Sequence, residues 1–122
     1  MKVLLSIKPE FAEKIFSGEK KYEFRRVLFK NKQIRTIIVY ASSPVQKIIG
    51  EFEIEQILSE DPETLWQQTK EHSGITRDFF FSYFRNKATA HAIKVKCARR
   101  YRQPLCIKKD FNTSPPQSFQ YI

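Results

Sequence analysis

Residues 18 to 25 hold the residue types that could bind or act on an anion. The segment reads Gly-Glu-Lys-Lys-Tyr-Glu-Phe-Arg, and Gly18 can adopt the positive φ that ends a helix. A lysine, a glutamate and an arginine this close together favour an anion site in which Glu23 orients the Arg25 guanidinium. A basic edge strand with solvated charges fits the same residues, so the residue types alone leave both interpretations open.

Strand alternation raises an objection to a single site. Successive side chains of a strand point to opposite faces of the sheet. Lys20 would therefore lie on the face opposite to Glu23 and Arg25. One cleft can hold all three side chains only if the strand begins with a turn or a bulge, which Gly18 allows.

The motif and its surroundings resemble a known family. Gly18, Lys20, Glu23 and Arg25 fit the pattern G-x-K-x-x-E-x-R, which is similar to the signature of the ASCH (activating signal cointegrator homology) domain. Four longer segments also look like bacterial ASCH proteins: VLLSIKPEFAEKIFSGEKKYEFRR, IIVYASSPVQKIIGEFEI, LWQQTKEHSGITRDFFFSYF and PPQSFQYI. The resemblance implies an α+β fold, a PUA-like ASCH β-barrel of five to seven mostly antiparallel strands with about three flanking helices. It also implies a cleft that binds RNA or a nucleotide.

Length and composition set outer limits. With 122 residues, 41% of them hydrophobic, we expect a single domain over residues 1–122. No apolar run approaches the roughly 18 residues that cross a bilayer. The apolar run within the N-terminal segment MKVLLSIKPE is too short for a signal peptide. We therefore expect a cytoplasmic protein without a membrane partner. Cys97 and Cys106 form no CxxC pair, so we expect buried or half-buried thiols, no metal and no cofactor.

The charge distribution favours an anionic partner. The formal net charge is +9, yet seven acids and one base lie between Glu51 and Glu71, and nine bases without an acid lie between Phe79 and Lys109. A polyanion would be attracted to the basic side of such a surface and repelled by the acidic side. RNA, single-stranded DNA or a nucleotide is the expected partner, while a basic protein without such a ligand is the alternative.

Hydrophobic periodicity and breaker residues predict the elements that position the motif. The expected strands span residues 3–7, 20–26, 36–41, 47–58, 88–100, 101–107 and 119–122. One helix is expected from about Pro9 to Ser17, and two shorter helices are expected between residues 62 and 85, capped by Asp61 and Thr76. The aromatic residues of the last helix are assigned to the core, and residues 28–35 to a loop.

The family resemblance implies that the motif strand and its flanks line the cleft. The candidate binding residues are Lys20, Glu23, Arg25, Arg26, Tyr40, Ser42 and Ser43. Arg25 can make a planar two-point contact with a phosphate or a base edge, and Glu23 can accept from a base amino group. Because that contact is planar, Arg25→Ala is expected to weaken binding most. Tyr40 can stack on a base or pack in the core, and Ser42 and Ser43 offer free backbone amides.

Two classes of function remain open at this stage. The first is a binding module, a regulator linked to transcription or RNA, with a protein partner in transcription as one option. The second is a small hydrolase with Lys20 and Glu23 as catalytic candidates. Some ASCH-like amidohydrolases that act on acetylated cytidine use a lysine and a nucleophilic threonine. Lys20 matches that lysine, but Glu23 stands at the threonine position and cannot act as a hydroxyl nucleophile. A ribonuclease in which Lys20 and Arg25 stabilise the phosphorane is the other enzymatic option.

Overall fold

The fold is built on one curled sheet of six strands. The computed structural model describes residues 1–122. The strands are β1 (Val3–Ile7), β2 (Tyr22–Arg25), β3 (Thr36–Ala41), β4 (Lys47–Glu60), β5 (Ala90–Leu105) and β6 (Phe119–Tyr121). Their order across the sheet is β2-β5-β4-β3-β1-β6, with β2 and β6 at the edges. All neighbours pair antiparallel except β1 and β3, which are parallel.

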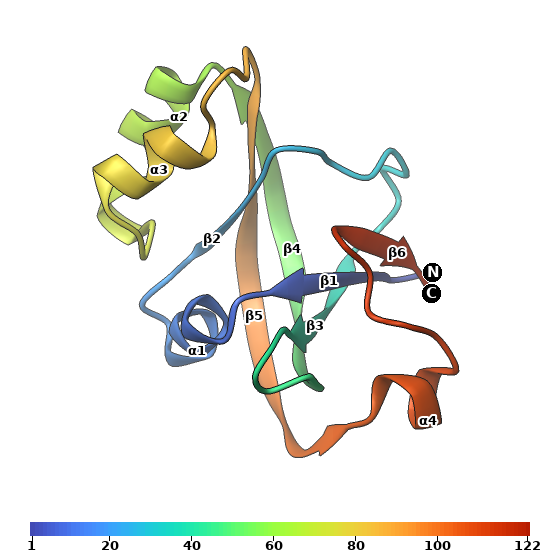
Figure 1. The fold of residues 1–122 in the computed structure, drawn as a ribbon. Coiled ribbons are helices and arrows are strands. Elements are labelled where there is room, and N and C mark those ends of the chain that lie inside the picture. The colour runs from blue at the N-terminus through green and yellow to red at the C-terminus, as the bar shows by residue number, and fades with distance from the viewer.

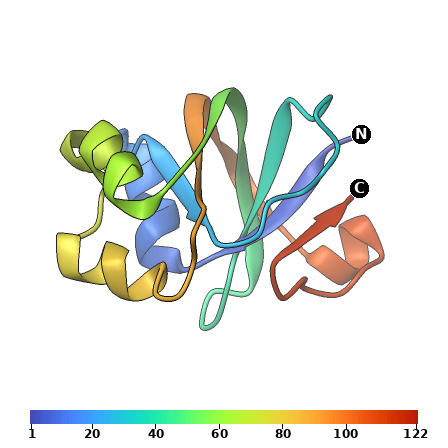
Figure 2. The same ribbon diagram turned by 90° about the horizontal axis from the view of Figure 1, so that it is seen from above.

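Four helices pack around this sheet (Figure 1). They are α1 (Pro9–Ser17), α2 (Pro62–Thr69), α3 (Arg77–Tyr83) and α4 (Ile107–Phe111), and a 3₁₀ turn, Lys70–His72, follows α2. The helices α2 and α3 lie together on one side of the curled sheet and α4 lies on the other (Figure 2). The expected α+β architecture, a curled and mostly antiparallel sheet with flanking helices, is confirmed.

Local signals in the sequence account for the helix boundaries. Pro9 opens α1, and Gly18 ends it in the left-handed conformation at φ 87°. The Asp61 carboxylate accepts a hydrogen bond from the backbone N–H of Thr64, and the Thr76 hydroxyl accepts one from Phe79. These caps satisfy amide groups that the first turn of a helix leaves free.

Three details differ from the expectations. Residues 88–107 do not form two strands that pair with each other, because β5 is one continuous strand that pairs with β4 from Ala90 to Leu105. Irregular register near Gly50 lets the β4–β5 ladder bend while it continues. The short helix α4 was not predicted, since its five residues are too few to show a helical period. Cys97 is exposed rather than buried.

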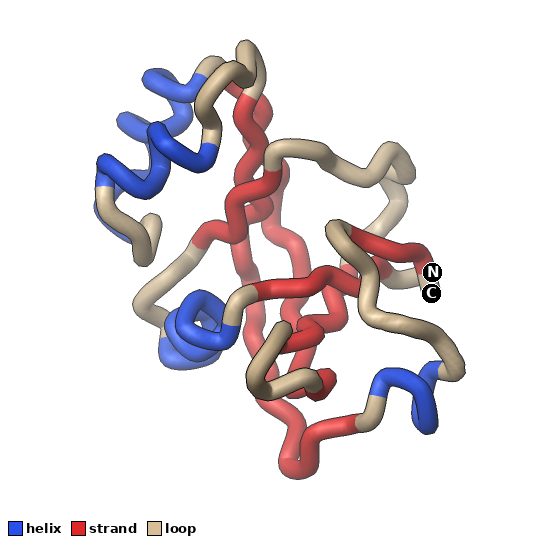
Figure 3. Tube along the Cα trace, viewed as in Figure 1, coloured by secondary structure: helices blue, strands red, loops and turns tan.

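Apolar side chains form three clusters. The largest lies on the inner face of the curled sheet beneath α1 and includes Val3, Leu5 and Ile7. The second holds Phe24, Trp66 of α2, and Phe80, Phe81 and Tyr83 of α3. The third lies on the opposite face of β1 and β3, against α4. Figure 3 shows the long loop, in tan, that leads from the β2 edge to β3.

Candidate functional site

A pocket of about 240 Å³ lies where β2 meets α1 and α3. It is named here the motif pocket. Its walls come from residues 6–8 and 11 at the β1–α1 junction, residues 20 and 23–25 of the motif, residues 75, 79 and 83 around α3, and residue 117. The pocket therefore gathers four segments that are far apart in the sequence.

Lys20 shares this pocket with Glu23 and Arg25 because it lies outside the strand. The Lys20 amide donates to Lys14 O at 2.9 Å, the amide of the next residue donates to His72 O at 2.9 Å, and β2 begins only at Tyr22. The turn at Gly18 thus removes the alternation objection, as the sequence had allowed. Lys20, Glu23 and Arg25 all line the motif pocket.

The Lys20 side chain is almost fully buried, with 2% of it exposed. Its Nζ donates to Ser73 O at 2.7 Å and lies 4.6 Å from the centre of the Phe24 ring and 5.4 Å from that of Phe11. Burial lowers the pKa of Lys20 to about 8, against the opposing effect of the Glu23 carboxylate. A fraction of the Lys20 amines is therefore neutral near pH 7.5 and can accept a proton.

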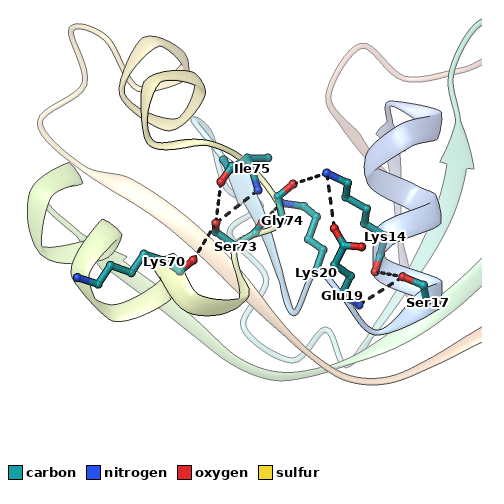
Figure 4. Close-up of polar contacts among 8 residues, drawn as sticks. All are labelled: Lys14, Ser17, Glu19, Lys20, Lys70, Ser73, Gly74 and Ile75. Carbon is teal, nitrogen blue, oxygen red and sulfur yellow. Dashed lines mark hydrogen bonds and ion pairs between the residues drawn. The ribbon is translucent and has the colours of Figure 1, made fainter.

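A glycine allows the segment after α2 to lie directly on the lysine stem (Figure 4). Gly74 has φ 69°, and a Cβ there would come within 2.6 Å of Lys20 Cβ. The carbonyl oxygen of Gly74 also accepts a hydrogen bond from Lys14 Nζ at 3.1 Å. Gly74 is therefore required for both its backbone conformation and its close approach.

Arg25 is held by four hydrogen bonds within the protein. Its Nη1 donates to Glu23 Oε2 at 3.1 Å and to Ser6 O at 3.3 Å, and its Nη2 donates to Ser118 O at 3.1 Å and Ser118 Oγ at 2.9 Å. Glu23 orients the guanidinium, as the residue types had indicated. The four terminal donors are already used, so a two-point phosphate contact from Arg25 would require these bonds to break. Arg25 instead ties β2 to β1 and to the segment before β6.

The three charged side chains of the motif are buried, although charged residues mostly stay exposed to solvent. The exposed fractions are 2% for Lys20, 5% for Glu23 and 9% for Arg25. Buried charges persist when they are paired and hydrogen-bonded, and here the Glu23 carboxylate and backbone carbonyls supply the partners. All three side chains still border the pocket.

The exposed part of the pocket is aromatic and cationic. The Phe79 side chain is 37% exposed and packs edge-on against Phe11 at 5.3 Å between ring centres. The Nζ of Lys8 lies 5.6 Å from the Phe79 ring centre. Tyr83 borders the same pocket, donates its hydroxyl to Phe24 O at 3.2 Å, and has a pKa raised by burial.

Sequence reasoning missed Lys8 and placed Phe79 in the core. The core assignment holds for Phe80 and Phe84, which are buried, but Phe79 lies at the edge of the helix face. The signal for Phe79 was present, because Phe79 and Tyr83 are four residues apart and form a stripe beside the buried one. Nothing in the sequence distinguishes Lys8 from the other surface lysines.

The other candidate residues lie outside the motif pocket. Tyr40 is 4% exposed and packs in the third cluster with Leu4 and Ile38, so the core interpretation of Tyr40 is the one that matches its position. Ser42 and Ser43 lie in the β3–β4 turn and do not border the pocket, and Arg26 is exposed just beyond β2. No group of three or more His, Cys, Asp or Glu side chains is placed to hold a metal ion.

No helix of the structure is long and apolar enough to span a bilayer.

Comparison with known proteins gives a family match over most of the chain. A family model described as the ASCH domain matches residues 5–99. A protein of Zymomonas mobilis named ASCH domain-containing ribonuclease is 30% identical over 123 residues, which cover 98% of this chain and 82% of that protein. The crystal structure of ASCH from Zymomonas mobilis superposes with a TM-score of 0.90 at 30% identity, and covers 99% of this chain and 87% of that one.

Another relative matches over only part of its length. The large ribosomal subunit protein uL22 of Ureaplasma parvum is 31% identical over 121 residues. The match covers 98% of this chain and 39% of that relative. The likeness therefore concerns one segment of that longer protein.

Proposed function

The chain belongs to the ASCH domain family, and on this premise we propose that it binds single-stranded RNA with one nucleotide in the motif pocket. A relative named as a ribonuclease supports a function linked to RNA. The observation that carries the proposal is the exposed Phe79 ring beside Lys8 at the mouth of a pocket whose floor holds Lys20. The pocket volume of about 240 Å³ lies below the ~300–1,000 Å³ of most small-molecule sites, which favours one base or phosphate.

Each wall of the pocket offers a contact that a nucleotide can use. Phe79 supplies an aromatic face, and stacking of a base on such a face contributes about 1–3 kcal/mol. Lys8 and Lys20 supply positive charge for a phosphate. Glu23 Oε2 accepts from Arg25, while its Oε1 has no hydrogen-bond donor within the protein and can accept from a base amino group.

Titration of a labelled oligonucleotide, followed by fluorescence anisotropy, tests this proposal. Phe79→Ala should weaken RNA binding by roughly 5- to 150-fold, the equivalent of one stacked base. Val45→Ala is the matched control, because Val45 is also an exposed apolar residue and lies outside the pocket. Lys8→Gln should weaken binding, whereas Lys2→Gln, the same charge change at the other end of β1, should not. Wild-type affinity in both pocket variants would refute the proposal.

RNA cleavage is a second candidate function, favoured by the lowered pKa of Lys20. In this reaction the neutral Nζ takes the proton of a ribose 2′-OH, and the 2′-oxygen forms a bond to the adjacent phosphorus. The P–O5′ bond breaks, and the departing oxygen takes a proton from water. The products are a 2′,3′-cyclic phosphate and a 5′-hydroxyl. A relative named as a ribonuclease supports RNA cleavage as a candidate function.

The pH dependence of the cleavage rate, a Lys20 variant and a 2′-deoxy substrate distinguish cleavage from binding. The rate should rise with pH through about pH 8 and then level off, since the base acts when Lys20 is deprotonated. Lys20→Arg keeps a positive charge but remains protonated, so it should bind RNA and fail to cleave it. An oligonucleotide with a single 2′-deoxy position should be cut everywhere except there. Cleavage at that position would exclude the 2′-OH mechanism.

A further inference from the structure

We propose that the loop of residues 26–35 and strand β4 form a second RNA-binding groove that continues the motif pocket. It is named here the loop groove. A single strand longer than one nucleotide would then lie across β2, β5 and β4. The inference rests on the proposed RNA binding, and it adds the path and the minimum length of the ligand.

The loop groove is large and carries unpaired positive charge. Its cavity of about 780 Å³ is bounded by residues 28–32, 34 and 35 of the loop and by residues 54–57 and 59 of β4. The exposed side chains of Lys30, Lys32 and Arg35 make no ion pair. The acid in the groove, Glu55, is paired with Lys94 at 3.0 Å. The groove therefore offers three free cations and a neutralised carboxylate.

A row of polar residues connects the two cavities. In the sheet Arg25 pairs with His91, and His91 pairs with Ser59. Directly paired residues of antiparallel strands point to the same face, so these three side chains share one face. Two strand spacings separate Arg25 from Ser59, roughly 10 Å. A single strand of two or three nucleotides can span that distance.

The middle of this row can contact a nucleotide directly. Ser59 Oγ and His91 Nδ1 form a hydrogen bond of 2.7 Å at the surface. Burial and the charge of Lys87 lower the pKa of His91, so the pair is uncharged near neutral pH and offers a hydroxyl and a ring nitrogen to ribose. Arg26, exposed and without an ion pair, follows the motif and begins the loop. The same loop thus runs from the motif pocket to the groove.

The loop is fixed before any ligand binds. Phe29 and Ile34 are buried in the main core, and Phe29 packs against Phe119. The Tyr121 hydroxyl accepts hydrogen bonds from the amides of Lys30 and Asn31, both at 3.0 Å. Holding the loop backbone in place reduces the entropy that is lost when a ligand binds.

The test compares RNA ligands of different length. A uridine mononucleotide and an octanucleotide of uridine are titrated against the wild type and against a double variant, Lys32→Glu with Arg35→Glu. The affinity for a single strand changes with salt at a log–log slope of about 0.7 per phosphate contact, so each contact contributes about fivefold at 0.1 M salt relative to 1 M salt. Loss of two contacts should therefore weaken octanucleotide binding by about 25-fold at 0.1 M salt. Mononucleotide binding should stay at the wild-type level, because the motif pocket is intact.

Two controls accompany this variant. Lys108→Glu with Lys109→Glu makes the same charge change on α4 and should leave the octanucleotide affinity within a few-fold of the wild type. Tyr121→Phe changes no charge but releases two loop amides, so it should reduce the gain from mononucleotide to octanucleotide. NMR amide shifts at residues 28–35 should appear with the octanucleotide and not with the mononucleotide.

The outcomes separate the two proposals. If the wild type binds neither RNA ligand, RNA binding and the loop groove both fail. If the wild type binds both ligands and the Lys32/Arg35 variant behaves like the α4 control, the motif pocket stands and the loop groove is refuted. A groove that binds an acidic peptide while octanucleotide affinity is unchanged would also refute it.

Discussion

The burial of Lys20 predicts that this protein becomes more stable as the pH rises above neutrality. The folded state lowers the pKa of Lys20 from 10.5 to about 8. One pKa unit corresponds to about 1.4 kcal/mol, so the charged form costs the fold about 3 kcal/mol below pH 8. Between pH 8 and 10.5 the folded lysine has lost its proton while the unfolded one keeps it. The unfolded state then binds more protons, and the free energy of unfolding rises with pH.

The magnitude can be measured within a mild pH range. From pH 7 to pH 9 the lysine contribution to the free energy of unfolding should rise by about 1.3 kcal/mol. With a urea m-value of about 1–3 kcal/mol/M, the unfolding midpoint should rise by roughly 0.4–1.3 M. Lys20→Met has a similar volume and no titrating group, so subtracting its midpoint shift removes the contribution of every other residue.

If the Lys20→Met midpoint changes with pH as much as the wild-type midpoint does, Lys20 is not the source of the pH dependence. A direct check is an NMR titration of the Lys20 side chain, which should give a pKa near 8. A pKa near 10.5 would mean that the amine is well hydrated in solution.

Three further outcomes follow from the same contacts. Arg25→Ala should lower the free energy of unfolding by about 3–5 kcal/mol, because it leaves Glu23 buried without its partner, and adding Glu23→Gln should recover part of that loss in urea unfolding. Gly74→Ala should destabilise the fold more than Gly18→Ala, since both sites have positive φ but only a Cβ at Gly74 would collide with Lys20. RNA affinity should fall with salt at a log–log slope near −3 if about four phosphates are neutralised, and a flat response would contradict RNA binding.

The Arg25 result would also correct the role first assigned to this residue. From the sequence, Arg25 was expected to contact the ligand and to matter most for binding. The structure directs its terminal donors to Ser6, Glu23 and Ser118. Loss of binding in Arg25→Ala is therefore expected to accompany loss of folding, and a comparison with Lys8→Gln separates the two effects.

Short-range sequence signals account for the local elements and for the identity of the motif. Pro9, Gly18, Asp61 and Thr76 act through their own backbone preferences and short-range hydrogen bonds. Helix α1 therefore begins and ends where predicted, and α2 and α3 begin directly after the predicted caps. Alternating apolar residues defined most strands, and the spacing from Gly18 to Arg25 identified the family. These signals act over a few residues and need no knowledge of the rest of the chain.

The roles of the motif residues depend on contacts with segments that are distant in the sequence. Lys20 is buried because Ser73 and Gly74, more than fifty residues away, lie against it. The terminal nitrogens of Arg25 already donate hydrogen bonds, because Ser6 in β1 and Ser118 before β6 lie against the guanidinium. A sequence period shows that a side chain lies on one face of an element, but packing against distant segments decides whether that face is filled. For the same reason Phe79 became a pocket wall while its neighbour Phe80 became core.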